Sequence, residues 1–246
     1  MFHPDVPDFF AVCLIFFGAG TVKGVLGMGL PTLAMGLLGL VMPVAGAASL
    51  LTVPSLLTNV WQAAGRGLAR TARRLWSMQV GIALGVALAP LLFPGGQQSI
   101  GPVLLGGCLV AYGALGLAGW QPKPPPARWQ ALAGLLAGAS TGIVTGLTGV
   151  FVLPAVPYLQ SLALGKDALS QALGLCFTTA TIALGVLLAV QGHLDRGTSL
   201  ASAVVVAPAV LGMVLGQAIR RQMSEALFRR CLFAGLLMLG SWLLMR

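Results

Sequence analysis

The sequence is a succession of long apolar runs separated by short loops, and this pattern constrains the fold more than any motif does. A run of roughly 20 apolar residues is long enough for a helix to cross a hydrocarbon core about 30 Å thick. The pattern predicts an all-α, polytopic helical membrane protein, with some segments short or interrupted by proline and therefore broken or re-entrant. The predicted apolar segments lie at about 9–27, 30–46, 47–63, 78–93, 99–119, 130–149, 151–164, 169–190, 199–219 and 231–245.

Composition agrees with a membrane protein and argues against other classes. Of the 246 residues, 57% are hydrophobic and 8% are charged, whereas soluble domains carry about 25% charged residues. The 34 glycines and 15 prolines suit packed or broken membrane helices better than the strands of a transmembrane barrel. The first apolar run follows MFHPDVPD, which has no basic residue. We therefore expect it to remain as the first membrane segment and not to be a cleaved signal peptide.

An internal repeat at a spacing of about 122 residues divides the chain near its midpoint. The predicted domains are a first membrane repeat at 1–120, a proline-rich cytoplasmic linker at 121–129 and a second membrane repeat at 130–246. The motif GTVKGVLG of the first half matches GIVTGLTG of the second, and CLVA at 108–111 resembles CLFA at 231–234. The matched motif residues are Gly20 and Gly142, Gly24 and Gly146, Gly27 and Gly149, and, at nearly the same offset, Pro31 and Pro154.

The placement of charge predicts the orientation of the chain. Basic residues concentrate in the loops at 64–77, 121–129 and 220–230, whereas the loop at 94–98 has no charge. By the positive-inside rule the three basic loops are cytoplasmic, in a bacterial-type inner membrane with an external N-terminus. Because each half then has five segments, an odd number, the second repeat runs opposite to the first, as in many secondary transporters.

The ionisable residues argue against several functions. Every acidic residue falls in a predicted tail or loop, which removes most support for a cation pump or an aspartyl intramembrane protease. The two histidines stand at segment ends and no Walker A pattern is present. We therefore expect no catalytic residue, no cofactor and no metal site. The net charge of +9 lies in the loops without a nucleic-acid-binding motif, so no nucleic-acid partner is expected. The acidic residues of the sequence are Asp5, Asp8, Asp167, Asp195 and Glu225, and its histidines are His3 and His193.

Within the predicted membrane segments the sequence leaves a cation, hydroxyls, amides and glycines. Lys23 is the single charged residue between Phe9 and Gly46. A positive charge among hydrogen-bond donors favours an anion, and helices that break at glycine clusters expose further backbone N–H donors. The predicted substrate-binding residues come from both halves and are Lys23, Gly24, Gly27, Gly29, Ser49, Thr52, Thr145, Gly146, Thr148 and Gly149.

Each of these features also has a purely structural interpretation. The Gly-x3-Gly spacing is the small-residue pattern of close helix packing, and Ser and Thr often bond the carbonyl four residues back. Lys23 lies about 21 Å along the first helix, near enough to the inner surface to snorkel. The cysteines form no CxxC motif, and we interpret all four, Cys13, Cys108, Cys176 and Cys231, as small buried hydrophobic residues.

The glycine-rich motifs resemble those of the TauE/SafE sulfite exporter family. GTVKGVLGMGLPTLAMGLLGL followed by GAASLLT, and GIVTGLTGVFVLPAVPYLQSLAL followed by SQALGLCFTT, look like the two repeats of that family. The resemblance covers nearly the whole chain and implies a multi-pass transporter that moves sulfite, organosulfonates or similar anions without ATP. The chain departs from the family pattern in GMGLP, which lacks consecutive glycines, and in AASLL, where no threonine precedes Ser49. The resemblance places in motif positions Gly24, Gly27, Gly29 and Pro31, and Gly146, Gly149 and Pro154.

We therefore predict a secondary transporter of small sulfur-containing or organic anions that works by alternating access, with a small anion and the lipid bilayer as partners. Export follows from the family resemblance, since nothing in the residues sets the direction, and the formation of a homo-oligomer stays open. The alternatives are an importer of sulfate or thiosulfate, a thiol-dependent sulfur transferase using Cys13 or Cys176, and a structural subunit of a larger complex.

Overall fold

The computed structural model describes residues 9–65, 67–120, 122–220 and 225–245, and within these ranges the regular structure is helical. The first half contains α1 (Phe9–Leu26), α2 (Leu30–Leu38), α3 (Val44–Ala63), α4 (Leu68–Arg74), α5 (Trp76–Leu92), α6 (Gly96–Ser99) and α7 (Gly101–Ala118). After the 3-10 helix η1 (Ala127–Trp129), the second half contains α8 (Gln130–Thr148), α9 (Ala155–Ser161), α10 (Lys166–Val190), α11 (Arg196–Val204), α12 (Val206–Arg220) and α13 (Glu225–Met245).

Length and hydropathy confirm the prediction of a multi-pass helical membrane protein. Seven helical stretches in the described residues are long and apolar enough to cross a membrane, and α4 with α5 forms a further candidate that is bent by 68°. Most predicted segments match a helix to within three residues. The predicted segment at 199–219 is two helices, α11 and α12, and the last segment begins at Glu225 and not at 231.

Two predicted segments contain helices that are too short to span a bilayer. The segment at 30–46 holds α2, with nine residues, and the segment at 151–164 holds α9, with seven. At 1.5 Å per residue these helices extend only about 14 Å and about 11 Å. Each follows a glycine with positive φ that ends the preceding helix, Gly27 at +74° and Gly149 at +71°. Both halves therefore contain an apolar segment whose helix is short and begins after a glycine break, as the glycine and proline pattern had suggested.

Helices α1 and α12 run parallel and pack through glycines. A Cβ on Gly20 would lie 2.1 Å from the Ala209 carbonyl oxygen, and a Cβ on Gly24 would lie 2.2 Å from that of Met213. Since both residue numbers rise together, the two helices point the same way. The packing interpretation of the Gly-x3-Gly spacing is thus correct for this pair, because close backbone approach leaves no room for a side chain.

Helices α5 and α8 form a second parallel pair of the same kind. A Cβ on Gly138 would lie 2.3 Å from the Met78 carbonyl oxygen, and one on Gly142 would lie 2.3 Å from that of Ile82. These two pairs, α1 with α12 and α5 with α8, make the most extensive helix contacts in the structure. In each pair, a helix that opens one half of the chain packs against a helix from the other half.

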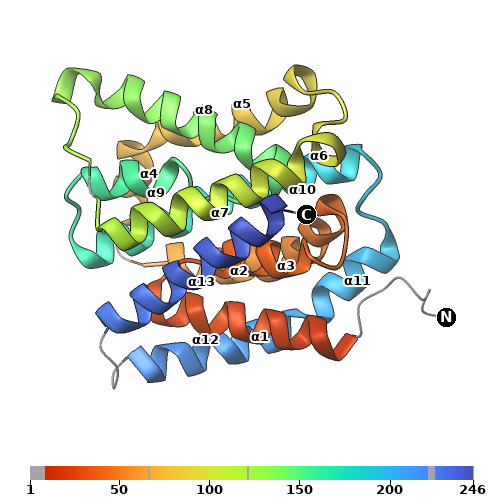
Figure 1. Ribbon diagram of the computed structural model, residues 1–246. Helices are drawn as coiled ribbons and strands as arrows, with labels where there is room; N and C mark the ends of the chain where they lie inside the picture. The colour runs from red at the N-terminus through yellow and green to blue at the C-terminus, as the bar shows by residue number, and fades with distance from the viewer. Residues whose placement is uncertain (1–8, 66, 121, 221–224, 246) are drawn as a thin grey trace.

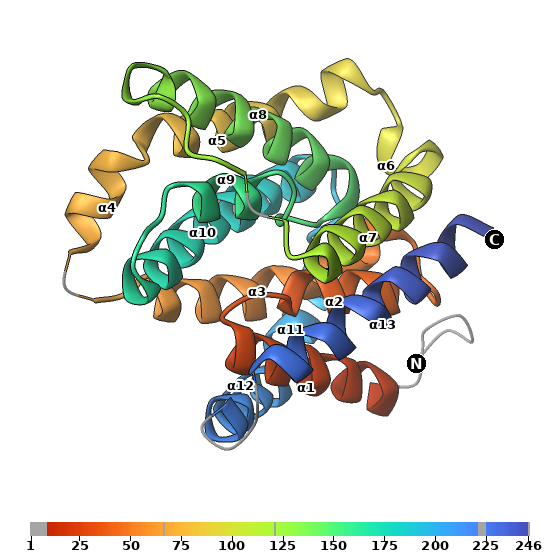
Figure 2. The same ribbon diagram turned by 60° about the vertical axis from the view of Figure 1, so that its left-hand side comes forward.

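Helices α3 and α10 pack against each other in the middle of the molecule, between the α5–α8 pair on one side and the α1–α12 pair on the other (Figure 2). Helices α7 and α13 also pack together, and they run antiparallel, because Gly106 lies on Gly240 whereas Gly113 lies on Phe233. The halves are therefore interleaved and do not form two separate bundles.

The helix directions give the molecule two distinct ends (Figure 1). We name as the basic end the one that holds α4, the segment 122–129 and the junction where α12 ends and α13 begins. The opposite end holds α6, the loop at 191–195, the start of α1 and the end of α13. Four residues used to predict orientation, Asp5, Asp8, Arg66 and Arg221, lie outside the described residues, as do His3 and the side chain of Glu225.

The central helix α3 contains Pro54, and the hydroxyl of Ser202 on α11 bonds backbone groups of α3 next to this proline. Proline has no N–H, so the carbonyl of Leu50 loses its usual helical partner. The Ser202 hydroxyl donates to the Leu50 carbonyl at 2.8 Å and accepts from the Val53 N–H at 3.1 Å. The helix therefore continues through a proline that the sequence suggested as an interruption.

The cysteines differ in their surroundings. Cys108 and Cys176 are buried and Cys13 is half-buried, but Cys231 is exposed on α13. The interpretation of all four as small buried residues is therefore wrong for Cys231, because α13 turns one face outward. Cys176 is completely buried and its thiol contacts the Gln79 amide at 3.1 Å. A thiol in this position is inaccessible to a substrate, which removes support for a sulfur transferase that uses it.

Candidate anion site

Lys23 occupies the last turn of α1 and points into the protein. Its side chain is 3% exposed. The Nζ atom donates to the Thr58 hydroxyl at 3.1 Å and to the Asn59 Oδ1 atom, both on α3. Thr58 can accept this bond because its own hydroxyl donates to the Pro54 carbonyl at 2.7 Å. The side chain is therefore anchored inside the helix bundle, and the snorkelling interpretation does not describe it.

Asn59 extends this network across the molecule. Its Nδ2 atom donates to the Thr181 hydroxyl on α10 at 3.2 Å. Asn59 and Thr181 are separated by 122 residues, the spacing of the internal repeat. Lys23 is thereby connected, through a single amide, to the central α3–α10 contact.

A second amide braces the break between α1 and α2. The Gln62 Nε2 atom donates to the Gly27 carbonyl at 2.6 Å and to the Ser170 carbonyl at 3.1 Å. The break itself needs glycine, since Gly27 and Gly29 have φ values of +74° and +105°, which side chains with a Cβ adopt at a cost. The end of α1, the end of α3 and the start of α10 are thus held together at the basic end.

A cavity of about 280 Å³ lies where these elements meet α12. Two basic residues line it, Lys23 and Arg220, and neutral hydroxyls and amides line much of the rest. No described residue in its lining is acidic. The remaining lining residues are Gly24, Gly27, Thr58, Trp61, Gln62, Ser170, Met213 and Gln217. We call this the Lys23 cavity. Its volume and its donors suit a small anion.

The electrostatics of the Lys23 cavity also favour an anion. A charged amino group buried among neutral oxygens retains a large part of its desolvation cost unless an opposite charge is near. The hydrogen-bond partners of the Lys23 amino group are an amide oxygen and a hydroxyl, and neither carries charge. An anion in the adjoining cavity would supply the missing counter-charge.

The second-half residues that the sequence predicted as ligands face their own backbone. The Thr145 hydroxyl lies 2.7 Å from the Thr141 carbonyl and 3.1 Å from the Val150 carbonyl. The Thr148 hydroxyl donates to the Val144 carbonyl at 2.7 Å and accepts from the Val150 N–H at 3.2 Å. These threonines stabilise the chain where it leaves α8 for the extended segment before α9.

The other predicted residues are distributed over several places. Gly24 and Gly27 line the Lys23 cavity, whereas Gly29 is the residue before α2. The Ser49 and Thr52 hydroxyls each donate to the carbonyl four residues back, at 2.9 and 3.0 Å. Gly149 ends α8 beside Met35. The structure thus brings three of the ten predicted residues together in the Lys23 cavity: Lys23, Gly24 and Gly27.

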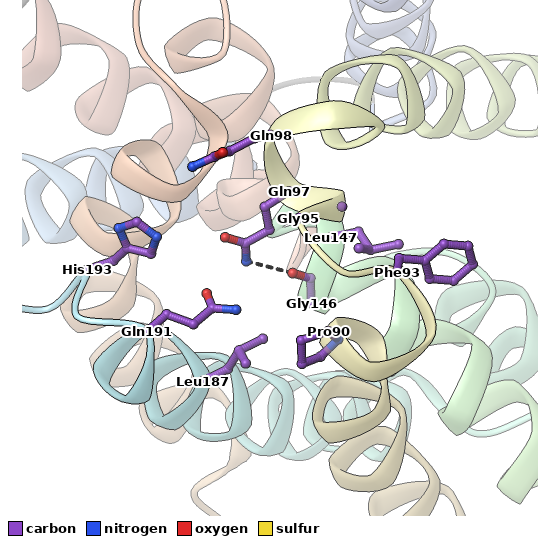
Figure 3. A pocket seen from close by; sticks show the side chains of 11 residues that line it. Pro90, Phe93, Gly95, Gln97, Gln98, Gly146, Leu147, Leu187, Gln191 and His193 are labelled. Carbon is purple, nitrogen blue, oxygen red and sulfur yellow. Dashed lines mark hydrogen bonds between the residues drawn. The ribbon is translucent and has the colours of Figure 1, made fainter.

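Gly146 lines a different cavity, at the opposite end, where α5, α8 and α10 finish (Figure 3). This cavity measures about 150 Å³, and the Gln97 Nε2 atom donates to the Gly146 carbonyl at 2.6 Å. Gln98, Gln191 and His193 also line it. We call it the His193 cavity. The hydrogen bond from the Gln97 side chain to the Gly146 carbonyl is of the same kind as the one that Gln62 makes to the Gly27 carbonyl at the basic end.

The predicted site included three of the ten residues that line the Lys23 cavity and missed the other seven, among them Gln217 and Arg220. Both lie on α12, which reaches the cavity only because glycines let it pack closely against α1. Arg220 was interpreted as a loop charge that sets orientation. The i, i+4 spacing of Gly212 and Gly216 upstream of these residues was a signal that this helix approaches another one closely.

Comparisons with known proteins agree with these features. The model of the family described as sulfite exporter TauE/SafE matches residues 12–243. A probable sulfite/organosulfonate exporter TauE from Cupriavidus necator is 27% identical over 234 residues, which cover 93% of this chain and 91% of that protein. No solved structure matches the chain.

Proposed function

The chain belongs to the sulfite exporter TauE/SafE family, and from this premise we propose that it is a secondary transporter that exports small sulfur-containing or organic anions, of the sulfite and organosulfonate kind. The observation that carries the proposal is the buried Lys23 side chain, bonded to neutral oxygens and lining a cavity without acidic residues among those described. Direction and substrate class are taken from the family and from the name of the relative.

We assign the direct contacts with the anion to the Lys23 cavity. Lys23 and Arg220 supply charge, and Ser170 and the amide of Gln217 supply neutral donors. Gly24 and Gly27 supply close backbone approach. The remaining predicted residues, Gly29, Ser49, Thr52, Thr145, Gly146, Thr148 and Gly149, act by shaping the two helix breaks and the central helices.

We propose an inverted repeat that works by alternating access. Two features support it. The pairing of α1 with α12 corresponds, in the other half, to the pairing of α8 with α5, and both pairs are parallel. Asn59 and Thr181 are equivalent in the repeat and bond to each other, as positions on a two-fold axis would. The Lys23 cavity and the His193 cavity, at opposite ends, are then the two faces that open in turn.

The proposed location is a bacterial inner membrane, with the basic end in the cytoplasm and the N-terminus outside. The described basic residues Arg70, Arg73 and Arg74 on α4, together with Lys123, support this orientation by the positive-inside rule. An exported anion would then enter through the Lys23 cavity.

The test uses the purified chain alone in proteoliposomes, with labelled sulfite and labelled methanesulfonate on the side of the basic end. Wild type is expected to bind and carry both anions. Lys23→Met should lose roughly tenfold or more in affinity, because a charged hydrogen bond contributes about 1.5–3 kcal/mol. Lys166→Met is the matched control, because Lys166 is exposed near the same end and should leave affinity unchanged.

Two outcomes would contradict this proposal. Near-wild-type transport by Lys23→Met at matched abundance would remove Lys23 from the site. Net uptake of sulfate or thiosulfate without efflux of sulfite, measured in vesicles of both orientations, would favour the importer.

A further inference from the structure

We propose that the His193 cavity is a second anion site, at the opposite end of the molecule, and that protonation of His193 controls its affinity. The proposal rests on the proposed function, because it concerns the face at which an exported anion leaves. Lys23 gives the basic end a buried basic side chain, whereas the His193 cavity has a side chain whose charge depends on the pH outside.

Polar side chains converge in this cavity. Figure 3 shows the side chains of Gln97, Gln191 and His193 around the same space, with the Gln97 amide bonded to the Gly146 carbonyl. A neighbouring cavity of about 520 Å³ shares Gln97, Gln98 and His193 with it, so these side chains line both spaces. Amides and an imidazole offer N–H donors, which suit the oxygens of a sulfonate or sulfite group.

Among the described residues that line these two cavities, His193 is the ionisable one. The other lining residues are neutral. They come from the ends of α5, α8 and α10 and the residues that follow α5 and α10, from α6, and from the starts of α3 and α7. The charge of the cavity therefore changes only with the imidazole, within the part of the chain that the structure describes.

Asp195 and Arg196 follow His193 in the chain and line another cavity. The Asp195 carboxylate accepts from the Thr198 N–H at 2.7 Å and from the Thr198 hydroxyl at 2.5 Å. These bonds hold the pKa of Asp195 below its usual value. Asp195 therefore keeps its negative charge across the range in which histidines titrate. Its charge and that of Arg196 do not change with pH in this range.

The state of His193 should set how readily the anion leaves. When the imidazole is neutral, the cavity offers only neutral donors and holds an anion weakly, so release is easy. When the imidazole is protonated, it attracts the anion and slows release. By linkage, an anion in the cavity in turn stabilises the protonated form. Acid outside the membrane should therefore strengthen external anion binding and slow efflux.

Methanesulfonate is the probe for the test, because its own charge does not change in this pH range. We would load right-side-out proteoliposomes with unlabelled methanesulfonate and measure the external concentration of labelled methanesulfonate that half-saturates its exchange into the vesicles. For wild type this concentration should fall on the order of tenfold between about pH 8 and about pH 5.5, the range in which histidine side chains gain charge.

Two variants separate His193 from other titrating groups. His193→Gln keeps neutral donors, so the external methanesulfonate concentration measured for it should be as high at about pH 5.5 as at about pH 8. His193→Lys keeps a positive charge over this range, so the same concentration should be low at both pH values. Neither should change the affinity measured from the basic end, which provides the control for folding.

The results that would overturn the proposal are distinct from those that would overturn the proposed function. A flat wild-type profile, or the same pH dependence in His193→Gln as in wild type, would show that His193 does not control the external site. If wild-type vesicles carry no methanesulfonate at either pH, the proposed function fails, and this proposal with it.

Discussion

The Lys23 cavity and the His193 cavity lie at opposite ends of the molecule and differ in chemistry. The first lies where α1, α3 and α12 end, and the second lies where α8, α10 and α5 end. In the first, two basic side chains, Lys23 and Arg220, line the wall. In the second, glutamines and one histidine do so. Helix ends from both halves frame each cavity, so the difference between the two lies in the side chains that line them and in the charge that these side chains carry.

The comparison requires that the two cavities face opposite sides of the membrane. Labelling of single cysteines from one side tests this, because each cysteine should react from one side and not from the other. On a background without the four native cysteines, Lys123→Cys is expected to react only from the cytoplasmic side, whereas Ser99→Cys and His193→Cys react from outside. Ser99 is used because Gly96, in the uncharged loop at 94–98, is buried. Arg70 lies on α4 at the basic end, so Arg70→Cys should behave as Lys123→Cys does.

Strong external labelling of Lys123→Cys would break the inverted arrangement. A membrane-permeant reagent that labels all four positions provides the control, since it shows that each cysteine is reactive. The same result would also reverse the assignment of the entry and exit cavities.

The two parallel helix pairs should be equally sensitive to added volume. Gly24→Ala in the α1–α12 pair and Gly142→Ala in the α5–α8 pair each place a Cβ less than 2.5 Å from a backbone oxygen. Overpacking of this kind costs about 1–3 kcal/mol, so both variants should show a clearly lower melting temperature in detergent.

Gly18→Ala and Gly107→Ala are the matched controls for these glycines, because nothing lies within 4 Å of a Cβ at either position. They should melt as wild type does. If one packing variant were tolerated and the other were not, the two pairs would not be equivalent, and the comparison of the two halves would be sharpened accordingly.

The smallest expected effects are those of removing single hydroxyls, and they distinguish a hydroxyl at the anion site, that of Thr58, from one that bonds only the backbone, that of Thr145. Thr58→Val removes an oxygen that accepts from Lys23 and should lower anion affinity by about 1 kcal/mol, roughly fivefold. Thr145→Val, at the position equivalent to Lys23, removes a hydroxyl that faces two backbone carbonyls. It should reduce thermal stability by a similar free energy and leave anion affinity unchanged. Isothermal titration and thermal melts on both variants measure the two quantities.

An equal loss of affinity in the two threonine variants would contradict the division of roles. Thr145 would then contact the anion as the sequence predicted, in a conformation in which the second half closes around the ligand.

The sequence by itself determined the class of the protein, most of the helical segments and the two helix breaks at Gly27 and Gly149. These are local properties. In a bilayer each backbone N–H must find a partner within its own helix, so long apolar runs become helices. Glycine and proline likewise act on the chain at their own positions, as Gly27 and Gly149 do. Lys23 could be identified for the same reason, since a lone cation in an apolar run is visible without knowing its neighbours.

Tertiary packing alone decided what surrounds Lys23. Thr58 and Asn59 reach it because α3 ends beside α1, and Arg220 joins the same cavity because Gly20 and Gly24 let α12 approach backbone to backbone. Packing also turned the predicted ligand Thr145 onto backbone carbonyls, although its position in the repeat equals that of Lys23. Spacing along the chain specifies which residues are equivalent, but the direction of a side chain and its neighbours depend on which helix packs against it.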